Sequence, residues 1–181
     1  MGQQGGDRLD YLTSRMDILD CINRIARGVD RLDRDIFRTG YHADAVLDFG
    51  THIGSPEQHM DFFFALHANM QKAHAHTICN HTCELDGDSA HTETYFLFAA
   101  RNRDETNWVA GGRYLDRLER RDGAWKIALR TNVIEWSGML PTMPIPFSEV
   151  PDIHANGAPA RSKADPSYLR PLVNKRDPQI P

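Results

Sequence analysis

The spacing of apolar residues divides this chain into a helical first part and a strand-rich second part. Over residues 14–30 apolar side chains recur every three or four positions, which predicts a helix. The expected stripe consists of Met16, Leu19, Ile22, Ala26 and Val29. Ser14 with Asp17 three residues later is typical of a capping box, so this helix is expected to begin at Ser14 and to end near Asp30.

A second helical region follows after a short interruption. The pattern predicts a short helical stretch over residues 33–37 and a strand over residues 45–49. Ser55 and Pro56 then mark a helix start, because serine favours the N-cap and proline the first helical position. This helix is expected to run to about Lys72. Its expected apolar face consists of Phe62, Phe63, Leu66 and Met70.

From His74 onward the apolar positions alternate with a period of two, which indicates β-strands. Strands are expected over residues 74–85, 90–101, 108–120 and 124–137. Asp-Gly turns at Gly87 and Gly123 predict two tight hairpins, and the adjacent glycines Gly111 and Gly112 predict a bulge or sharp bend. Helices followed by an antiparallel meander predict an α+β fold, with the helices packed on one face of a curved sheet.

Composition narrows the class of protein. The chain has 181 residues, which fits one domain, and 25 acidic against 21 basic residues give a net charge of -4. Without a basic stripe, nucleic acid is not an expected partner, and no apolar run approaches the roughly 20 residues of a membrane span. The first residues lack a signal-peptide pattern. An odd number of cysteines, 3, then predicts free thiols in a reducing cytoplasm.

The last part of the chain has a different composition. Nine of the 10 prolines lie in residues 141–181. We therefore expect a folded domain over residues 1–137 and a Pro-rich C-terminal arm over residues 138–181, packed on the domain or on a neighbouring subunit. Tyr168, Leu169 and Leu172 are its expected anchors, and a loose tail is the alternative.

One carboxylate stands out on the first helix. Ile22, Ala26 and Asp30 are successive i+4 neighbours, which places Asp30 at the inner edge of the apolar stripe. A carboxylate there is costly to bury unless a partner meets it. The alternative is an exposed group, or one bridged to Arg27 or Arg31.

Two histidines open the first long strand. Strict alternation would place His74, His76, Ile78 and Asn80 on one face. A histidine acts as a base near neutral pH when a carboxylate holds its other nitrogen, although a half-buried structural histidine is the simpler alternative. Two imidazoles could also chelate a metal, but no third ligand lies at suitable spacing, so no metal is expected.

An arginine interrupts the apolar pattern of the last strand. Alternation would place on one face Lys126, Ala128, Arg130, Asn132, Ile134 and Trp136. An arginine between apolar neighbours is costly unless it meets an anion, and a surface position is the alternative.

Several short motifs, in order and spacing, resemble one known family. They are Gly28-Val-Asp30, Ala45-Val-Leu-Asp-Phe-Gly50, His76-x-x-x-Asn80, Leu85-Asp-Gly-Asp88, Gly111-Gly-Arg-Tyr114 and Arg120-Arg-Asp-Gly-Ala-Trp-Lys126. Over residues 10–137 the chain resembles the SnoaL-like family of the NTF2-like superfamily. The resemblance implies a cone-shaped α+β barrel with a deep pocket.

Within that superfamily the pattern is similar to scytalone dehydratase, bile-acid 7α-dehydratase and hexachlorocyclohexane dehydrochlorinase. Those enzymes use an Asp–His dyad as general base for elimination, without metal or cofactor. The resemblance assigns catalytic roles to Asp30, His76 and Arg130, the last at the leaving group. The expected substrate contacts are Phe49, His74, Tyr95, Tyr114, Asn132 and Ile134.

The chain also departs from this pattern. Val29 and Phe49 stand where scytalone dehydratase has tyrosines, and no acid lies near residues 99–101. The polar groups that protonate a leaving hydroxyl are therefore reduced, and scytalone is not the expected substrate.

The expected function is that of a cofactor-independent lyase in the breakdown of aromatic or polycyclic hydrophobic molecules. Water, halide or an aldehyde such as formaldehyde would leave. The alternatives are an isomerase or cyclase with the same base, and a non-catalytic binding or structural subunit resembling the β subunit of ring-hydroxylating dioxygenases. A homo-oligomer is expected, a trimer before a dimer.

Overall fold

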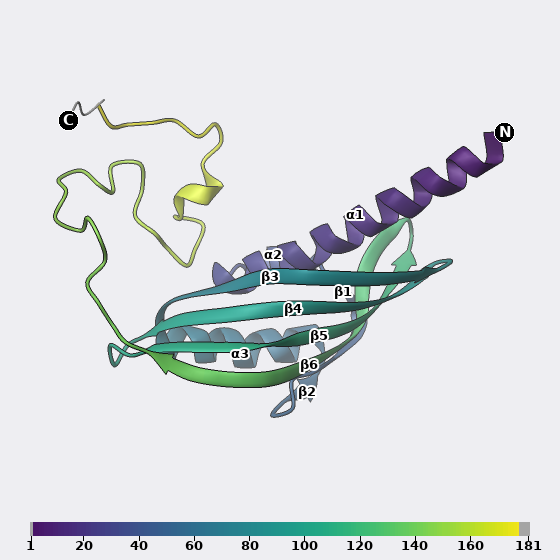
Figure 1. The fold of residues 1–181 in the computed structure, drawn as a ribbon, viewed down its shortest axis with the longest axis horizontal. Helices are drawn as coiled ribbons and strands as arrows, with labels where there is room; N and C mark the ends of the chain where they lie inside the picture. Colours follow the sequence, from purple (N-terminus) through teal and green to yellow (C-terminus); the bar gives the residue numbers. More distant parts are fainter. Residues whose placement is uncertain (1, 178–181) are drawn as a thin grey trace.

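Three helices pack on a curved six-stranded sheet (Figure 1). The computed structural model describes residues 2–177, with side chains from residue 8 onward. The helices are α1 (Gly2–Asp30), α2 (Arg34–Arg38) and α3 (Pro56–Met70). The strands are β1 (Tyr41–Asp48), β2 (Ile53–Gly54), β3 (Gln71–Asp86), β4 (Ser89–Asn102), β5 (Asn107–Arg121) and β6 (Ala124–Leu140).

The sheet is mixed, with the strand order β2-β1-β6-β5-β4-β3. Strand β1 runs parallel to β6, and the other neighbours are antiparallel. The long strands β3 to β6 curve around α3 (Figure 1). The α+β class and the four long strands expected from the alternating pattern are confirmed.

Helix α1 begins earlier than its capping signal predicted. Ser14 lies inside the helix and is buried, so it is not the N-cap. The buried stripe consists of Ile18, Cys21, Ile22 and Ile25, whereas Met16 is 67% exposed. The first turns project past the sheet (Figure 1), and Asp10 there forms an ion pair with Arg120. The buried face of α1 is therefore rotated about the helix axis relative to the apolar stripe that the sequence predicted.

Helix α3 begins as predicted but turns a different face inward. Ser55 and Gln58 form the capping box, and Pro56 begins the helix. The buried side chains include His59, Met60, Phe64 and His67. Phe62, Leu66 and Met70 are exposed, so the expected apolar face was wrong. Aromatic stacking explains why histidine is accepted inside, since the ring centre of His59 lies 4.3 Å from that of Phe63 in a stacked arrangement.

Strand β3 contains a bulge that exchanges its faces. Ile78 pairs with Phe96 but His81 pairs with Thr94, so β3 holds one extra residue. A bulge of this kind reverses the side-chain direction beyond it. Asn80 is exposed, and the expectation that it shares the face of the preceding histidines was wrong.

Strand β6 contains two such bulges. Relative to β5 it has an extra residue at Ala128 and another at Glu135. Ile127 is buried before the first bulge and Arg130 after it, so the expected common face over residues 126–136 was wrong. The surface alternative for Arg130 is also excluded, because this residue is 2% exposed.

The irregularity predicted at the paired glycines is present as a bulge, with its extra residue on the neighbouring strand β6. The second β6 bulge lies opposite the step from Gly111 to Gly112. A Cβ on Gly111 would lie 2.4 Å from the indole of Trp136, so only glycine fits under that ring.

Residues 141–177 form the C-terminal arm, whose only regular element is the short 3-10 helix η1 (Pro166–Tyr168). The arm leaves the end of β6 and returns towards α1 and α2 (Figure 1). Tyr168 anchors it by donating a hydrogen bond from its hydroxyl to Asp33, at 2.7 Å. Leu172 is 72% exposed and does not anchor it. Through this bond the arm contacts the N-cap of α2 in its own chain.

Two further expectations concern the whole chain. Cys21, Cys79 and Cys83 are all free thiols, as predicted. Among the described residues no helix combines the length and apolar character needed to cross a membrane.

Candidate active site

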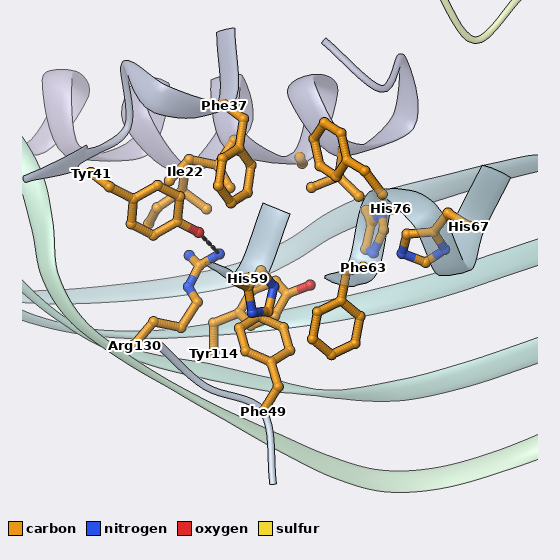
Figure 2. Close-up of a pocket in the computed structure, with 14 residues that line it drawn as sticks. Ile22, Phe37, Tyr41, Phe49, His59, Phe63, His67, His76, Tyr114 and Arg130 are labelled. Atoms are coloured by element: carbon orange, nitrogen blue, oxygen red, sulfur yellow. Dashed lines mark hydrogen bonds between the residues drawn. The ribbon is translucent and has the colours of Figure 1, made fainter. Parts of the chain in front are cut away.

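A small cavity lies between the helices and the sheet (Figure 2). Its volume is about 40 Å³, enough for a few water molecules. The lining is largely apolar and aromatic. Its polar members are Tyr41, His59, His67, His76, Tyr114 and Arg130.

Asp30 and His76 meet at one end of this cavity. The Nδ1 atom of His76 lies 2.7 Å from Oδ1 of Asp30, and the backbone N–H of His76 donates to both carboxylate oxygens at 3.1 and 3.0 Å. A carboxylate only accepts, so Nδ1 carries the proton. Nε2 is then left with a lone pair, which is the arrangement of a general base.

The dyad lies between two hollows of the protein. His76 lines the central cavity, and both dyad residues also line a separate hollow of about 250 Å³ between α1 and β3. The other residues of that hollow are Asn23, Ala26, Arg27, Arg31 and Ile78. The side chains of His76 and Asp30 keep 12% and 14% exposure, so neither is sealed from solvent.

Arg130 occupies the opposite end of the cavity (Figure 2). Its Nε and Nη2 atoms each donate to a different oxygen of Asp116 at 2.7 Å. Nη1 lies 3.4 Å from the hydroxyl of Tyr41, and the guanidinium lies 4.1 Å from the ring centre of Tyr114. Asp116 thus neutralises a charge that would otherwise be costly to bury. Burial raises the pKa of both tyrosines, so their hydroxyls stay protonated.

Two cavity histidines were missed by the sequence reasoning. His59 and His67 lie on the inner side of α3, and burial lowers their pKa to about 3 and about 4. Nδ1 of His67 is 2.7 Å from Oε1 of Gln71, whereas Nδ1 of His59 has no hydrogen-bond partner. The signal that could have found them is their i+4 spacing around Phe63, which places all three on one helix face.

The expected substrate contacts are only partly brought together. Phe49 and Tyr114 line the cavity. Tyr95 points outward and is 41% exposed, because the inward positions of β4 are its even-numbered neighbours. Ile134 is 57% exposed, since Gly112 beside it offers no side chain to cover it. Neither side chain lines the cavity.

The remaining two expected contacts lie near the cavity without lining it. Asn132 is half-buried, and its Oδ1 atom has no hydrogen-bond partner. His74 is buried behind the dyad, where its Nε2 atom lies 3.1 Å from the carbonyl oxygen of Val29.

Asp30, His74 and His76 also have the composition of a metal-binding group. Their potential ligand atoms lie within 4.8 Å of one another. Hydrogen bonds already use most of these atoms: Asp30 accepts from His76, and His74 Nε2 donates to Val29. The geometry is that of a hydrogen-bonded network, in agreement with an acid–base role.

Comparisons with known proteins agree with this architecture. The family model described as a SnoaL-like domain matches residues 10–131. No sequence among the curated proteins matches the chain.

Solved structures with the same fold include two dehydrochlorinases. A type 2 hexachlorocyclohexane dehydrochlorinase is 21% identical, with a TM-score of 0.72 over 79% of this chain and 99% of that one. The type 3 enzyme from Novosphingobium barchaimii is also 21% identical, with a TM-score of 0.70 over 76% and 97%. A candidate scytalone dehydratase from Novosphingobium aromaticivorans is 13% identical, with a TM-score of 0.66 over 74% and 91%. At these identities the likeness establishes the fold.

Proposed function

Because the chain belongs to the family of SnoaL-like domains, we propose that it is a cofactor-independent lyase whose general base is His76. The observation that carries the proposal is the 2.7 Å hydrogen bond from His76 Nδ1 to Asp30, which leaves Nε2 free beside a buried cavity. Dehydrochlorinases with the same fold support an elimination reaction.

In the proposed reaction His76 Nε2 removes a proton from carbon or from a hydroxyl of the substrate. When the proton comes from carbon, the C–H electrons form a carbon–carbon double bond as halide or hydroxide leaves, and hydroxide takes the proton from the imidazolium to depart as water. When the proton comes from a hydroxyl, the O–H electrons form the carbonyl of an aldehyde such as formaldehyde as a carbon–carbon bond breaks, and the carbanion left on the substrate takes the proton back from the imidazolium. Asp30 stabilises the imidazolium that results. At the other end of the cavity the hydroxyl of Tyr114 donates to developing negative charge, while Arg130, paired with Asp116, sets the local electrostatic field. General base catalysis contributes roughly 10²–10⁴-fold, and these groups supply part of the remainder.

The substrate is proposed to be a hydrophobic aromatic or polycyclic small molecule. The aromatic lining supports this class, but a cavity of about 40 Å³ is far smaller than the roughly 300–1,000 Å³ of ordinary ligand pockets. Substrate entry therefore requires side chains to move. Phe49 and Phe63, whose rings are 5.4 Å apart over His59, are the proposed movable wall.

The test uses a panel of halogenated, hydroxylated and hydroxymethyl aromatic compounds. His76→Ala and Asp30→Asn should each lower turnover at least about 100-fold, because the base or its orientation is lost. His91→Ala and Asp86→Asn are matched controls on exposed positions and should keep full turnover. Wild-type turnover in both dyad variants would disprove the role of the dyad.

An isomerase or cyclase is the second candidate. Burial raises the pKa of Tyr114, so its hydroxyl is a neutral donor suited to an enolate-like oxygen that never leaves. Product mass separates the two reactions, because elimination loses a fragment and isomerisation does not.

A non-catalytic binding or structural subunit is the third candidate. The small cavity is the observation that favours it. This role predicts a stable heterologous partner chain in pull-downs and no turnover of any compound in the panel.

We also propose a homotrimer in a reducing cytoplasm, where the three free thiols would persist. The outer face of the sheet supports self-association, because Leu97, Leu115 and Leu129 are partly exposed there. Light scattering of the full chain and of a chain ending at Gly138 tests both the assembly and the part of the arm in it.

A further inference from the structure

Arg161 of the C-terminal arm lies at the end of α3, directly behind the dyad. Its Nη1 atom donates to the carbonyl oxygen of His67 at 2.8 Å, and its Nη2 atom donates to that of Gln71 at 2.5 Å. The last carbonyls of a helix carry partial negative charge and lack helical partners. The guanidinium therefore caps α3 and fixes the point where β3 begins.

The same guanidinium determines which nitrogen of His74 carries the proton. Nη1 lies 3.3 Å from Nδ1 of His74, and an arginine only donates, so Nδ1 must accept. The proton is then on Nε2, which donates to the carbonyl oxygen of Val29 at 3.1 Å. Both contacts agree on one neutral form of this fully buried ring.

The form of His74 matters because Asp30 is close. Nε2 of His74 lies 3.8 Å from Oδ1 of Asp30, just beyond hydrogen-bond distance. A doubly protonated or rotated His74 would compete with His76 for this carboxylate. Burial and the neighbouring His67 lower the pKa of His74 to about 3, in the direction that prevents this.

The groups that face His74 come from every element around it. Asp30 comes from α1, His67 stacks on it from α3 at 4.5 Å, His76 comes from its own strand, and Arg161 comes from the arm. Strand β4 contributes the uncharged ring of Phe98. Among these, Arg161 is the one supplied by the arm rather than by the domain.

We propose that Arg161 is a positioning residue that holds His74 in its neutral Nε2–H form and thereby reserves Asp30 for His76. The proposal deepens the function proposed above and rests on it only where turnover is concerned. It makes the C-terminal arm part of the acid–base machinery, although no arm residue lines the cavity.

Other contacts hold the arm so that Arg161 stays in place. Asp165 pairs with Arg31 at 3.4 Å, and the hydroxyl of Tyr168 donates to Asp33. Lys163 pairs with Asp35 at 3.0 Å on the surface, where solvent screening leaves such a contact weak. Lys163→Gln is therefore the matched control, since it removes one arm cation without touching a histidine.

The first experiment needs no substrate. Ring ¹⁵N spectra of the full chain at pH 7 should show His74 purely as the Nε2–H form, with its signals assigned by their loss in His74→Gln. Arg161→Met should replace this pattern by a mixture of tautomers or by a cationic ring, and Lys163→Gln should leave it unchanged. An unaltered His74 spectrum in Arg161→Met would overturn the proposal. If that variant does not fold, Arg161→Lys takes its place in the same spectra. Lysine keeps the positive charge but lacks the forked guanidinium that donates to both carbonyls and to the ring of His74.

The second experiment measures turnover with whichever panel compound the wild type converts. Arg161→Met should lower kcat by about 10- to 100-fold with little change in KM, as expected for a misplaced base. In the His74→Gln background the same change should add nothing, since Arg161 acts through His74. An undiminished kcat in Arg161→Met, or additive losses in the double variant, overturns the link to the dyad. Absence of turnover in the wild type itself contradicts the proposed function, while the spectra still decide the state of His74.

Discussion

The two ends of the cavity each hold a carboxylate paired with a basic side chain, and the two pairs differ in structure. At one end Arg130 and Asp116 form two parallel hydrogen bonds, with side chains 2% and 0% exposed. At the other end His76 and Asp30 share one side-chain hydrogen bond and keep 12% and 14% exposure. One pair is closed to solvent, and the other retains an unused nitrogen.

The difference separates a structural pair from a chemical one. In a buried bidentate pair each charge is neutralised by the other and all the facing hydrogen-bond groups are occupied. Such a pair contributes to the stability of the fold and to the local electrostatic field. A pair with an unused lone pair on an accessible ring can take a proton from a bound molecule. The family resemblance assigned catalytic roles to both His76 and Arg130, and this contrast in geometry is why we propose the more direct role for His76.

Removal of Asp116 should have the largest effect on stability. Asp116→Ala leaves the Arg130 charge buried without a partner, so the free energy of unfolding should fall by about 3–5 kcal/mol. Urea unfolding measures this loss. A double variant, Asp116→Leu with Arg130→Met, is the control and should recover much of the stability. A loss below about 1 kcal/mol in Asp116→Ala would show that the pair is not sealed.

Acid should act on the buried histidines of the cavity and spare the Arg130–Asp116 pair. Below about pH 6.5 the unfolded chain binds protons on its histidines. The buried rings of His59, His67 and His74 do not, because their pKa values are about 3, about 4 and about 3. The unfolded state thus binds more protons, and stability falls as the pH falls.

By about pH 5.5 the loss should be on the order of 1 kcal/mol for each of these histidines. Urea unfolding at pH 7 and at pH 5.5 gives the difference. His59→Phe should reduce the pH dependence by one histidine's share. An unchanged stability between the two pH values would mean that these rings are accessible to protons in the folded chain.

Asp30→Asn should have the smallest effect on stability. The side chain keeps its shape and one acceptor oxygen, so we expect a loss of about 1–2 kcal/mol in urea unfolding. Asp86→Asn, at an exposed position, provides the baseline. A loss as large as that of Asp116→Ala would remove the contrast between the two ends.

The sequence predicted the elements better than it predicted their faces. The hairpins at Gly87 and Gly123, the start of α3 at Ser55 and the bulge at Gly111 follow from local chemistry and were confirmed. Which side chains point inward depends on bulges and on helix rotation, which are settled by packing between distant segments. Tyr95 and Ile134 do not line the cavity for that reason.

The meeting of Asp30 and His76 illustrates the same limit. Helical spacing placed Asp30 near the apolar stripe, and alternation placed His76 on one face of its strand. Their 2.7 Å contact joins residues 46 positions apart, and only the family resemblance suggested it beforehand. Asp116 and Arg161 were not foreseen, because an alternating strand and a proline-rich arm give no local sign of a buried partner.

The two bulges of β6 give the site a further property. They enclose residues 129–134, so this segment is out of phase with the strand on both sides. The number of residues between the bulges, rather than their identity, determines which side chains of this segment point inward. The extra residue at Ala128 turns Arg130 inward, and the extra residue at Glu135 restores the original alternation. Without these two extra residues the alternation of the strand would turn the same arginine to the opposite face. A binding site can therefore be opened or closed here by two single-residue length changes, and sequence comparisons of this strand need to be aligned through those two positions.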